Sequence, residues 1–493
     1  DEHAESAGAG IPSQSAPGSD VHTNEPTGGA DVWSVVLFDQ FNTPQPDQQR
    51  ARAELVRFVN ALSPRANVAL LSFGGALRVV SPFSAGQPGM VKALTDGALQ
   101  FHPGPLLHPY NADEQFDLQQ QLLNHLPPVS ARAVRDNRRE TEMGELEIRV
   151  KNTLTAFSSI AQWLARYPGK KNVYWLSAGF PLTAEPQQFR RQDGVSGDAA
   201  FRRDFFELQQ RVNHELASAR IALFPLDVRG TLGGLREGID SADIKGAQYA
   251  EPGGDQLLSD DIGQDDQRIA QEHVDMLDLA RATGGIARFN RNDLADVLAG
   301  QFRQGQNFYS VSYIPSNTHY DGKYRKIDLA VLDRDNHKNR YRLSYRHGYF
   351  AVAAFAPPQN TIDAFTLALK SGAPPATGLI FTSRFIPRTA NGKASISYSI
   401  ATSGLQFTPT ADGGESASVD CAIVEYDKSG TLVRTSQIHV DGHVKPGQQD
   451  RVKISAFPAK QEFVLAPETA VLAVGVRDHT TGNFGAIHFA IGH

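Results

Sequence analysis

Cysteine is almost missing from this sequence of 493 residues, since Cys421 is the only one. A lone cysteine excludes a disulfide bond within the chain, and its alternation with Val419 and Ile423 predicts a buried thiol on a strand. Long apolar runs are missing too, because the longest, such as residues 68–73, have the length of a strand and not of a membrane span. We therefore expect neither a disulfide-stapled module nor a transmembrane segment.

Positive charge is not in excess either. The formal net charge is −6 and the isoelectric point is near 6.2. A protein that binds nucleic acid needs a net basic face, because it must neutralise phosphates. The charge balance therefore argues against nucleic acid as a main partner.

The sequence also lacks the short motifs of well-known catalytic sites. The segment 214–218, which begins with His214 and Glu215, has no second histidine and so does not match a zinc protease. There is no G-x-S-x-G elbow and no Walker loop, and the 15 histidines are scattered. These absences favour binding over catalysis, and we expect no enzymatic activity.

The first 30 residues differ in composition from the rest of the chain. They contain five acidic residues and no Lys or Arg, and they are rich in Gly, Ser, Ala and Pro. Such a segment buries too little apolar surface to offset the entropy of ordering, which predicts a disordered acidic leader over residues 1–30. The start at Asp1 predicts a processed chain whose signal segment has been removed, as in an exported protein.

Residues 31–302 alternate between buried strands and amphipathic helices. The run 32–39 is almost continuously apolar and ends in a carboxylate, as expected for a strand covered on both faces, and residues 172–177 and 221–227 are similar. This rhythm predicts an α/β domain with a doubly wound, mostly parallel sheet of the Rossmann type. A Gly- and Asp-rich stretch, 228–266, is predicted to be a long surface loop.

After residue 302 the apolar residues alternate with a period of two. We expect a β extension packed on the α/β domain at 303–355, a helix and Pro-rich joint at 356–377, and an all-β C-terminal sandwich at 378–493.

Six segments in order resemble the acidobacterial von Willebrand factor A-related family, a degenerate relative of the von Willebrand factor A-type domain. They are FDQFNTP at 38–44, NVALLSF at 67–73, PGKKNVYWLSAGFP at 168–181, LARATGGIARFN at 279–290, YDGKYRKIDL at 320–329 and RHGYFA at 346–351. The resemblance implies a von Willebrand factor A-like domain and an exported protein.

The A-type parent of this family binds Mg²⁺ through an Asp-x-Ser-x-Ser motif, a Thr from another loop and a further Asp. By this resemblance Asp39 and Thr43 match the first and last positions of the motif, and the further Thr is Thr153 or Thr155. Phe41 stands where the parent has a serine, and Ala178 stands where it has the further aspartate. With a single carboxylate left, we expect a degenerate metal site, no resident cofactor and at most weak binding of Mg²⁺. The other reading is that Asp39 and Thr43 bond to backbone.

The strand ends at one edge of the predicted sheet are the expected binding surface, because ligands of open α/β sheets lie there. The candidate ligand-facing residues are Asn42, Ser177, Gly179 and Asp227. We expect a secreted, periplasmic or cell-envelope protein that acts in protein–protein recognition, for example adhesion, with a protein ligand that the sequence does not identify. The alternatives are a hydrolase that uses unaligned Asp, Ser and His groups, and a purely structural envelope scaffold.

Overall fold

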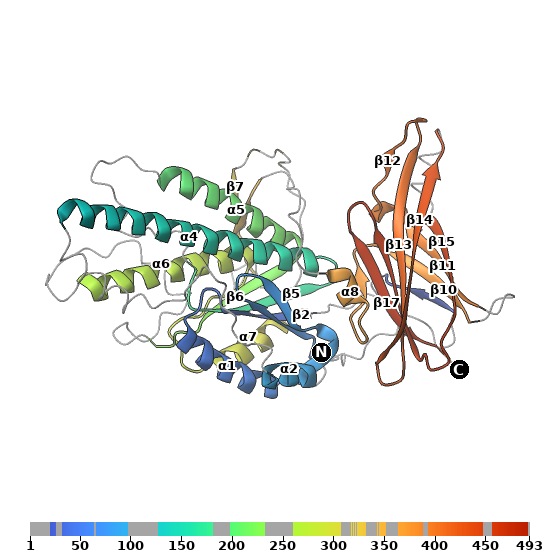
Figure 1. The fold of residues 1–493 in the computed structure, drawn as a ribbon, viewed down its shortest axis with the longest axis horizontal. Helices are drawn as coiled ribbons and strands as arrows, with labels where there is room; N and C mark the ends of the chain where they lie inside the picture. The colour runs from blue at the N-terminus through green and yellow to red at the C-terminus, as the bar shows by residue number, and fades with distance from the viewer. Residues whose placement is uncertain are drawn as a thin grey trace.

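The computed structural model places a helix-covered sheet beside a separate group of antiparallel strands (Figure 1). It describes residues 20–25, 32–63, 66–96, 127–180, 198–231, 260–306, 317, 319, 321, 323–331, 343, 345–351, 363–387, 393–446 and 456–491. Within this part of the chain, no helix combines the length and apolarity that a membrane crossing requires.

The helix-covered sheet has five strands in the order β4-β3-β2-β5-β6. These are β2 (Val32–Asp39), β3 (Val68–Phe73), β4 (Leu77–Ser81), β5 (Lys170–Ser177) and β6 (Ile221–Asp227). Strand β2 pairs in parallel with both β3 and β5, and β5 pairs in parallel with β6. Strand β4 is antiparallel to β3. Strands β2 and β5, both predicted as buried strands of a parallel sheet, are therefore parallel neighbours.

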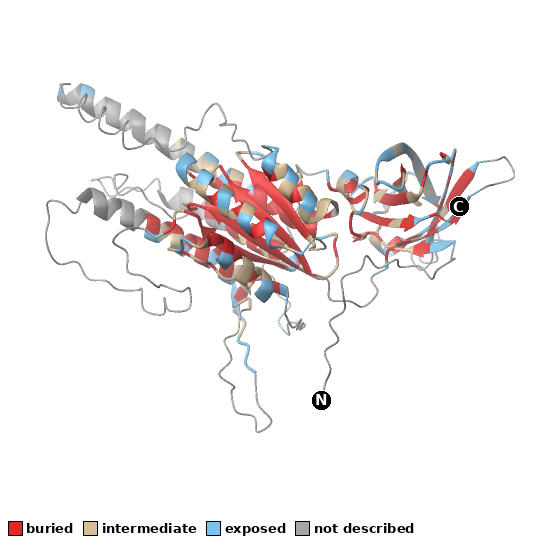
Figure 2. Cartoon of the chain, turned by 90° about the horizontal axis from the view of Figure 1, so that it is seen from below, coloured by how far each residue is buried: buried red, intermediate tan, exposed pale blue. Residues whose placement is uncertain are grey.

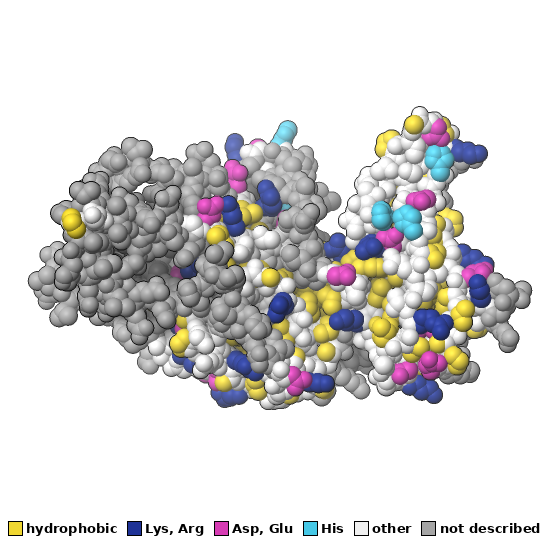
Figure 3. Space-filling model, in the orientation of Figure 1, with side chains coloured by type: hydrophobic (Ala, Val, Ile, Leu, Met, Phe, Trp, Pro, Cys, Tyr) yellow, Lys and Arg dark blue, Asp and Glu magenta, His cyan; other side chains and the backbone are white. Residues whose placement is uncertain are grey.

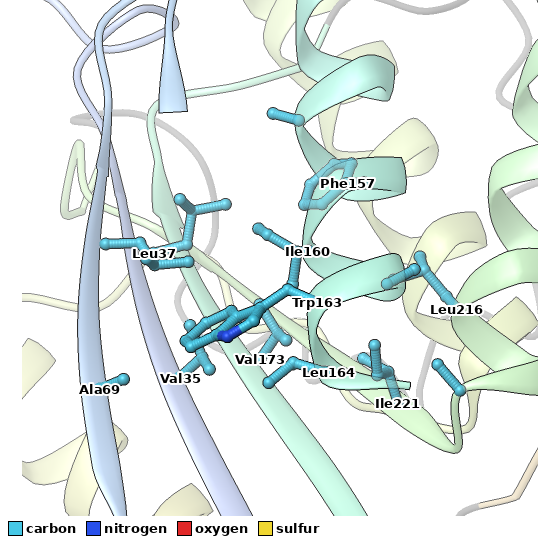
Figure 4. Close-up of a cluster of buried hydrophobic side chains, with 14 of the residues drawn as sticks. Val35, Leu37, Ala69, Phe157, Ile160, Trp163, Leu164, Val173, Leu216 and Ile221 are labelled. Carbon is cyan, nitrogen blue, oxygen red and sulfur yellow. The ribbon is translucent and has the colours of Figure 1, made fainter. Parts of the chain in front are cut away.

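Alternate residues of β2 enter two different cores, because helices cover both faces of the sheet (Figure 2). Val36 and Phe38 pack against α1 (Gln45–Asn60), α2 (Gly86–Thr95) and α7 (Leu294–Gln306). Val35 and Leu37 face α4 (Pro128–Leu164), α5 (Asp198–Ser218) and α6 (Asp260–Thr283). On that second face the α4 side chains Phe157, Ile160, Trp163 and Leu164 lie over Val35, Leu37 and Val173 (Figure 4). Burial on both faces explains why the strand is apolar at almost every position.

The expected fold class is wrong for this chain, because a doubly wound and mostly parallel sheet was expected to dominate it. The parallel pairings just described are confined to one small sheet that also has an antiparallel edge strand. Every other pairing between named strands in the described residues is antiparallel. The chain is mixed α/β with mostly antiparallel sheets. The alternation of strands and helices is a local pattern, and it does not fix how the remaining strands of the chain pair.

Two antiparallel sheets form the C-terminal part. One has the order β1-β10-β11-β15, and the other has the order β12-β13-β16-β17-β9, with β14 also paired to β13. Their bounds are β1 (Val21–Thr23), β9 (Ala376–Thr377), β10 (Phe381–Ile386), β11 (Ala394–Ala401), β12 (Thr408–Pro409), β13 (Glu415–Tyr426), β14 (Leu432–Val444), β15 (Ala456–Phe463), β16 (Val471–Asp478) and β17 (Phe484–Ala490). Side chains from both sheets share one hydrophobic core, which includes the buried Cys421.

The remaining short elements of the described residues fall at several places in the sequence. They are β7 (Tyr324–Lys326) and β8 (Gly348–Phe350), which pair with each other, the helix α8 (Ala364–Ala368), and the 3-10 turns η1 (Phe83–Ala85) and η3 (Thr402–Gly404). Helix α8 lies at the junction in Figure 1, and its Phe365 packs edge-on against Phe484. The guanidinium of Arg166, just after α4, stacks over the same Phe484 ring at 5.1 Å. A single apolar cluster therefore runs from the helix-covered sheet into the antiparallel part.

Two expected irregular segments contain regular structure. Residues 21–23, inside the predicted disordered leader, form β1 and pair with β10, and the Asn24 side chain bonds to the backbone of Ala376, Leu379 and Phe381. The backbone groups that Asn24 bonds to lie more than 350 residues later in the sequence, so no local pattern indicates strand β1. In the predicted loop 228–266, helix α6 already begins at Asp260, and residues 232–259 lie outside the described residues. Acidic residues favour the first turn of a helix, which suits this start.

Candidate functional site at the carboxyl edge of the parallel strands

Strands β2, β5 and β6 end at the same edge of the sheet, because they run in parallel and in register. Phe38 lies opposite Leu176, and Ser177 lies opposite Asp227. As a result the predicted residues Asp39 and Ser177 meet, and the Ser177 hydroxyl donates to Asp39 Oδ2 at 3.0 Å. The sequence prediction that these strand ends share one edge is confirmed.

The carboxylate of Asp39 is fully buried and accepts four hydrogen bonds. The backbone N–H of Asn42 donates to Oδ1 at 3.0 Å, and the Asn42 side-chain amide donates to Oδ2 at 2.8 Å. The indole N–H of Trp175 also donates to Oδ2, at 2.9 Å, beside the Ser177 hydroxyl. Burial raises the pKa of Asp39, although these hydrogen bonds oppose the shift. The carboxylate thus ties the loop after β2 to strand β5.

Asn42 links Asp39 to helix α4. Its amide nitrogen donates both to Asp39 Oδ2 and to the Thr153 hydroxyl, at 2.9 Å, and its oxygen accepts from Arg149 Nε at 3.3 Å. The Thr153 hydroxyl in turn donates to the Arg149 carbonyl at 2.8 Å. Of the two threonines predicted as alternatives, Thr153 is buried at this position and Thr155 is exposed.

Thr43, the third predicted metal ligand, faces another way. Its hydroxyl accepts from the backbone N–H of Ala178 at 3.1 Å, so it fixes the loop after β5. It is not among the four groups that donate to Asp39. Phe41, at the other motif position, packs edge-on against Phe73 with ring centroids 5.2 Å apart.

These residues do not fit a bound Mg²⁺ ion. A hard cation needs oxygen ligands, but the Asn42 amide nitrogen, a hydrogen donor, bridges Asp39 and Thr153. The carboxylate of Asp39 is already surrounded by donors, and the neighbouring Ala178 adds no oxygen from its side chain. The hydrogen-bond network itself links the loop, the strand and the helix.

A second buried polar cluster lies around Asp227 at the end of β6. The Arg229 guanidinium bonds to both Asp227 oxygens, with Nε 3.0 Å from Oδ1, and its other arm reaches Glu272 Oε2 at 2.7 Å. His273 Nε2 lies 2.6 Å from Asp227 Oδ2. Burial alone would raise the pKa of Asp227, but His273 and Arg229 outweigh it and hold the pKa below its usual value.

Gly179 connects the two clusters. Its carbonyl accepts from the Ser177 hydroxyl at 3.0 Å, and a Cβ at this position would lie 2.6 Å from Glu272 Cδ. A side chain there would collide with the second cluster, which explains the glycine.

The four predicted ligand-facing residues are brought together, but they lie beneath the surface. Asn42, Ser177, Gly179 and Asp227 are all buried. They hold the loops in place and do not themselves form an exposed surface. Sequence reasoning missed Arg229, Glu272 and His273, because the last two come from α6, more than 40 residues after Asp227, and no motif connects them.

Comparisons with known proteins add little to this picture. No protein-family model matches the chain, and no curated protein matches it. Among solved structures, the chain is similar to a conserved hypothetical protein, BatB from Bacteroides thetaiotaomicron, at 11% sequence identity and a TM-score of 0.24. That match covers 56% of this chain and 99% of BatB. BatB is therefore a distant structural neighbour, and the likeness carries no argument about function.

Proposed function

We propose that this chain is a non-enzymatic protein of the extracellular space or the cell envelope that recognises another protein. The recognising surface is the carboxyl edge of β2, β5 and β6 with the loops that follow these strands. The resemblance of the sequence to the von Willebrand factor A-related family supports both the mode of action and the export. Ligands of open α/β sheets lie at this edge.

The observation that carries the proposal is the saturated carboxylate of Asp39. Four donors from the loop after β2 and from strand β5 surround it, and Asn42 extends the network to α4. A buried and fully satisfied polar network rigidifies the segments that it joins. A rigid edge suits recognition, because less conformational entropy is lost when a partner binds.

The polar groups at the edge are not arranged for nucleophilic catalysis. Such catalysis needs a hydroxyl or thiol within hydrogen-bond reach of a base. In the described part of the chain, His273 contacts Asp227 and Arg229 and stacks on Phe289. The Ser177 hydroxyl bonds instead to Asp39 and Gly179. This arrangement favours binding over the alternative of a hydrolase.

Exposed side chains next to the network are the expected contacts. Ile148, beside Arg149 on α4, is 42% exposed. Ala76 is exposed in the turn after β3, where a Cβ added at the neighbouring Gly75 would reach the Phe41 ring. Gln45 and Pro46 are exposed at the start of α1. Together they give the edge a small, weakly polar surface.

The proposal is tested by comparing two surface variants in capture from an extract of the envelope and medium of the source cells. In the edge variant, Ile148→Glu and Ala76→Glu place charge on the proposed surface. In the control, Leu432→Glu changes a residue that is 58% exposed on β14, in the antiparallel part. We expect the wild type and the control to retain the same protein and the edge variant to lose it.

Three other outcomes would contradict the proposal. Equal capture by the edge variant and the wild type would place recognition elsewhere, and no saturable partner at all would favour a structural scaffold. Hydrolysis of a panel of ester, phosphate and peptide substrates that His273→Ala abolishes would favour the enzyme.

A further inference from the structure

A separate polar cluster lies on the antiparallel part of the molecule. Asp420 on β13 stands directly opposite His439 on β14, and it is also paired with Arg477 on β16. His479 follows β16, and its backbone N–H donates to the Ser418 carbonyl at 2.9 Å, which holds it beside Asp420. In Figure 3 the histidines of this part gather with acidic side chains on one outer face.

The ligand atoms of this cluster converge. His439 Nδ1 lies 2.8 Å from Asp420 Oδ1, and His479 Nδ1 lies 3.2 Å from Asp420 Oδ2. All three residues can offer ligand atoms within 4.8 Å of one another. Ligands about 2.1 Å from a shared Zn²⁺ in tetrahedral geometry stand about 3.4 Å apart, so the observed spacing needs only small side-chain adjustments.

The surroundings resemble the outer shell of a metal site. A ligating histidine usually donates its second ring N–H to a carboxylate, which fixes the ring and its tautomer. His439 has this arrangement, since its Nε2 lies 3.1 Å from Asp441 Oδ1, and the Ser418 hydroxyl bonds to the same Asp441 oxygen. The ring is therefore held between an inner carboxylate, Asp420, and an outer one.

Asp420 is also fixed in place. Its side chain is only 7% exposed, and Arg477 donates to Oδ2 at 2.8 Å while its guanidinium stacks over Phe365. This positive charge opposes a cation and lowers the expected affinity. In the described structure, however, Arg477 bonds to Oδ2, and Oδ1 bonds to His439 alone. The two histidines are half-exposed, so an ion can reach them from solvent.

We propose that Asp420, His439 and His479 form a binding site for a divalent transition-metal ion, with Zn²⁺ as the best fit. Two imidazole nitrogens and one carboxylate suit Zn²⁺ better than Mg²⁺ or Ca²⁺, which prefer oxygen ligands. Three protein ligands on an exposed face leave a fourth coordination position open to water or to a ligand group from a partner.

The competing description is a salt-bridge cluster in which a protonated His439 is held by Asp420 and Asp441. The chain contains a matched control for this reading. His443, on the same face of β14, pairs with Asp412 at 2.9 Å. It has one carboxylate partner, and it lies outside the group of three converging ligands. Removing it takes away an exposed histidine but no proposed ligand.

The experiment is calorimetric titration of the full chain, freed of metal by chelation, with Zn²⁺ at mildly alkaline pH. Co²⁺ serves as a spectroscopic probe, because four-coordinate Co²⁺ absorbs in the visible range. We expect one Zn²⁺ site per chain whose affinity falls at least about tenfold in His439→Ala and in His479→Ala, along with the Co²⁺ absorption. Asp441→Asn should weaken binding by about tenfold, the lower end of the effect of an outer-shell partner. His443→Ala should bind like the wild type.

Two results would overturn the proposal. The first is a wild-type binding heat no larger than that of the His439→Ala/His479→Ala double variant, which leaves only background binding. The second is an equal loss in His443→Ala, which indicates scattered surface histidines. Unchanged thermal unfolding of each variant establishes that lost binding is not lost folding.

Discussion

Replacing Asp39 tests whether the buried network stabilises the helix-covered sheet. In Asp39→Ala, the Trp175 indole and the Asn42 backbone N–H lose their partner, because each is bonded only to this carboxylate in the described structure. The Asn42 amide and the Ser177 hydroxyl keep second partners. Each buried donor left unpaired costs about 1–3 kcal/mol, and two such donors give an expected loss centred on about 3–5 kcal/mol.

Tryptophan fluorescence is the natural assay for this change. The chain has three tryptophans, Trp33, Trp163 and Trp175, and all belong to the core around the parallel strands. Thermal unfolding followed by fluorescence therefore reports on this part, and the expected loss corresponds to a midpoint lowered by roughly 6–20 °C. Asp39→Asn keeps one acceptor oxygen and should lose less.

Glu147→Ala is the control, because it removes a carboxylate of α4 that is paired with Lys151 on the surface. An exposed pair of this kind contributes roughly 0.3–0.5 kcal/mol. If Asp39→Ala lowers the midpoint no more than Glu147→Ala, the network does not stabilise this part of the molecule and the reasoning is refuted.

Three further predictions concern other positions. Burial lowers the pKa of His488 to about 4, and hydrogen bonding to nearby backbone only partly offsets this shift. As the pH falls below about 6.5, His488 therefore gains a proton in the unfolded chain while it stays neutral in the folded chain. Stability should therefore fall by up to about 3 kcal/mol as the pH drops from about 6.5 to about 4, and His488→Leu should flatten that slope in urea titrations at several pH values. Gly179→Ala should cost about 1–3 kcal/mol, because the new Cβ displaces Glu272; an unchanged midpoint would contradict this. Finally, the wild type should show no tight Mg²⁺ binding by calorimetry, whereas Phe41→Ser with Ala178→Asp should raise the affinity by restoring two oxygen ligands.

Local pattern was enough to predict the strands at the centre of the helix-covered sheet. The continuous apolar run at 32–39 predicted β2 with the bounds that the structure has, and burial on both faces is the physical reason. The meeting of Asp39 with Ser177 followed from the parallel pairing. Thr153 was among the predicted ligands only through the family resemblance, and the structure brings it to Asp39 through Asn42.

What the sequence pattern did not predict depends on pairings between distant segments. The fold class was wrong because alternation in one region does not determine the antiparallel pairings of the rest. Asp420, His439 and His479 are each unremarkable in the sequence, and only the register of β13 with β14 brings the first two face to face. The pattern H-x-D at 439–441 places His439 and its outer carboxylate on one face of a strand, but it gives no indication of Asp420 or His479.

The position of β1 has a consequence for how the chain folds during synthesis. The Thr23 hydroxyl bonds to the Phe381 carbonyl, 358 residues later in the sequence. At about 5–20 residues per second, the ribosome makes β10 roughly 20–70 s after β1. The helix-covered sheet is synthesised in that interval, so its folding precedes completion of the antiparallel sheet. Strand β1 then docks late, onto the edge of β10. Without β1, this edge would be open to pairing with strands of other chains.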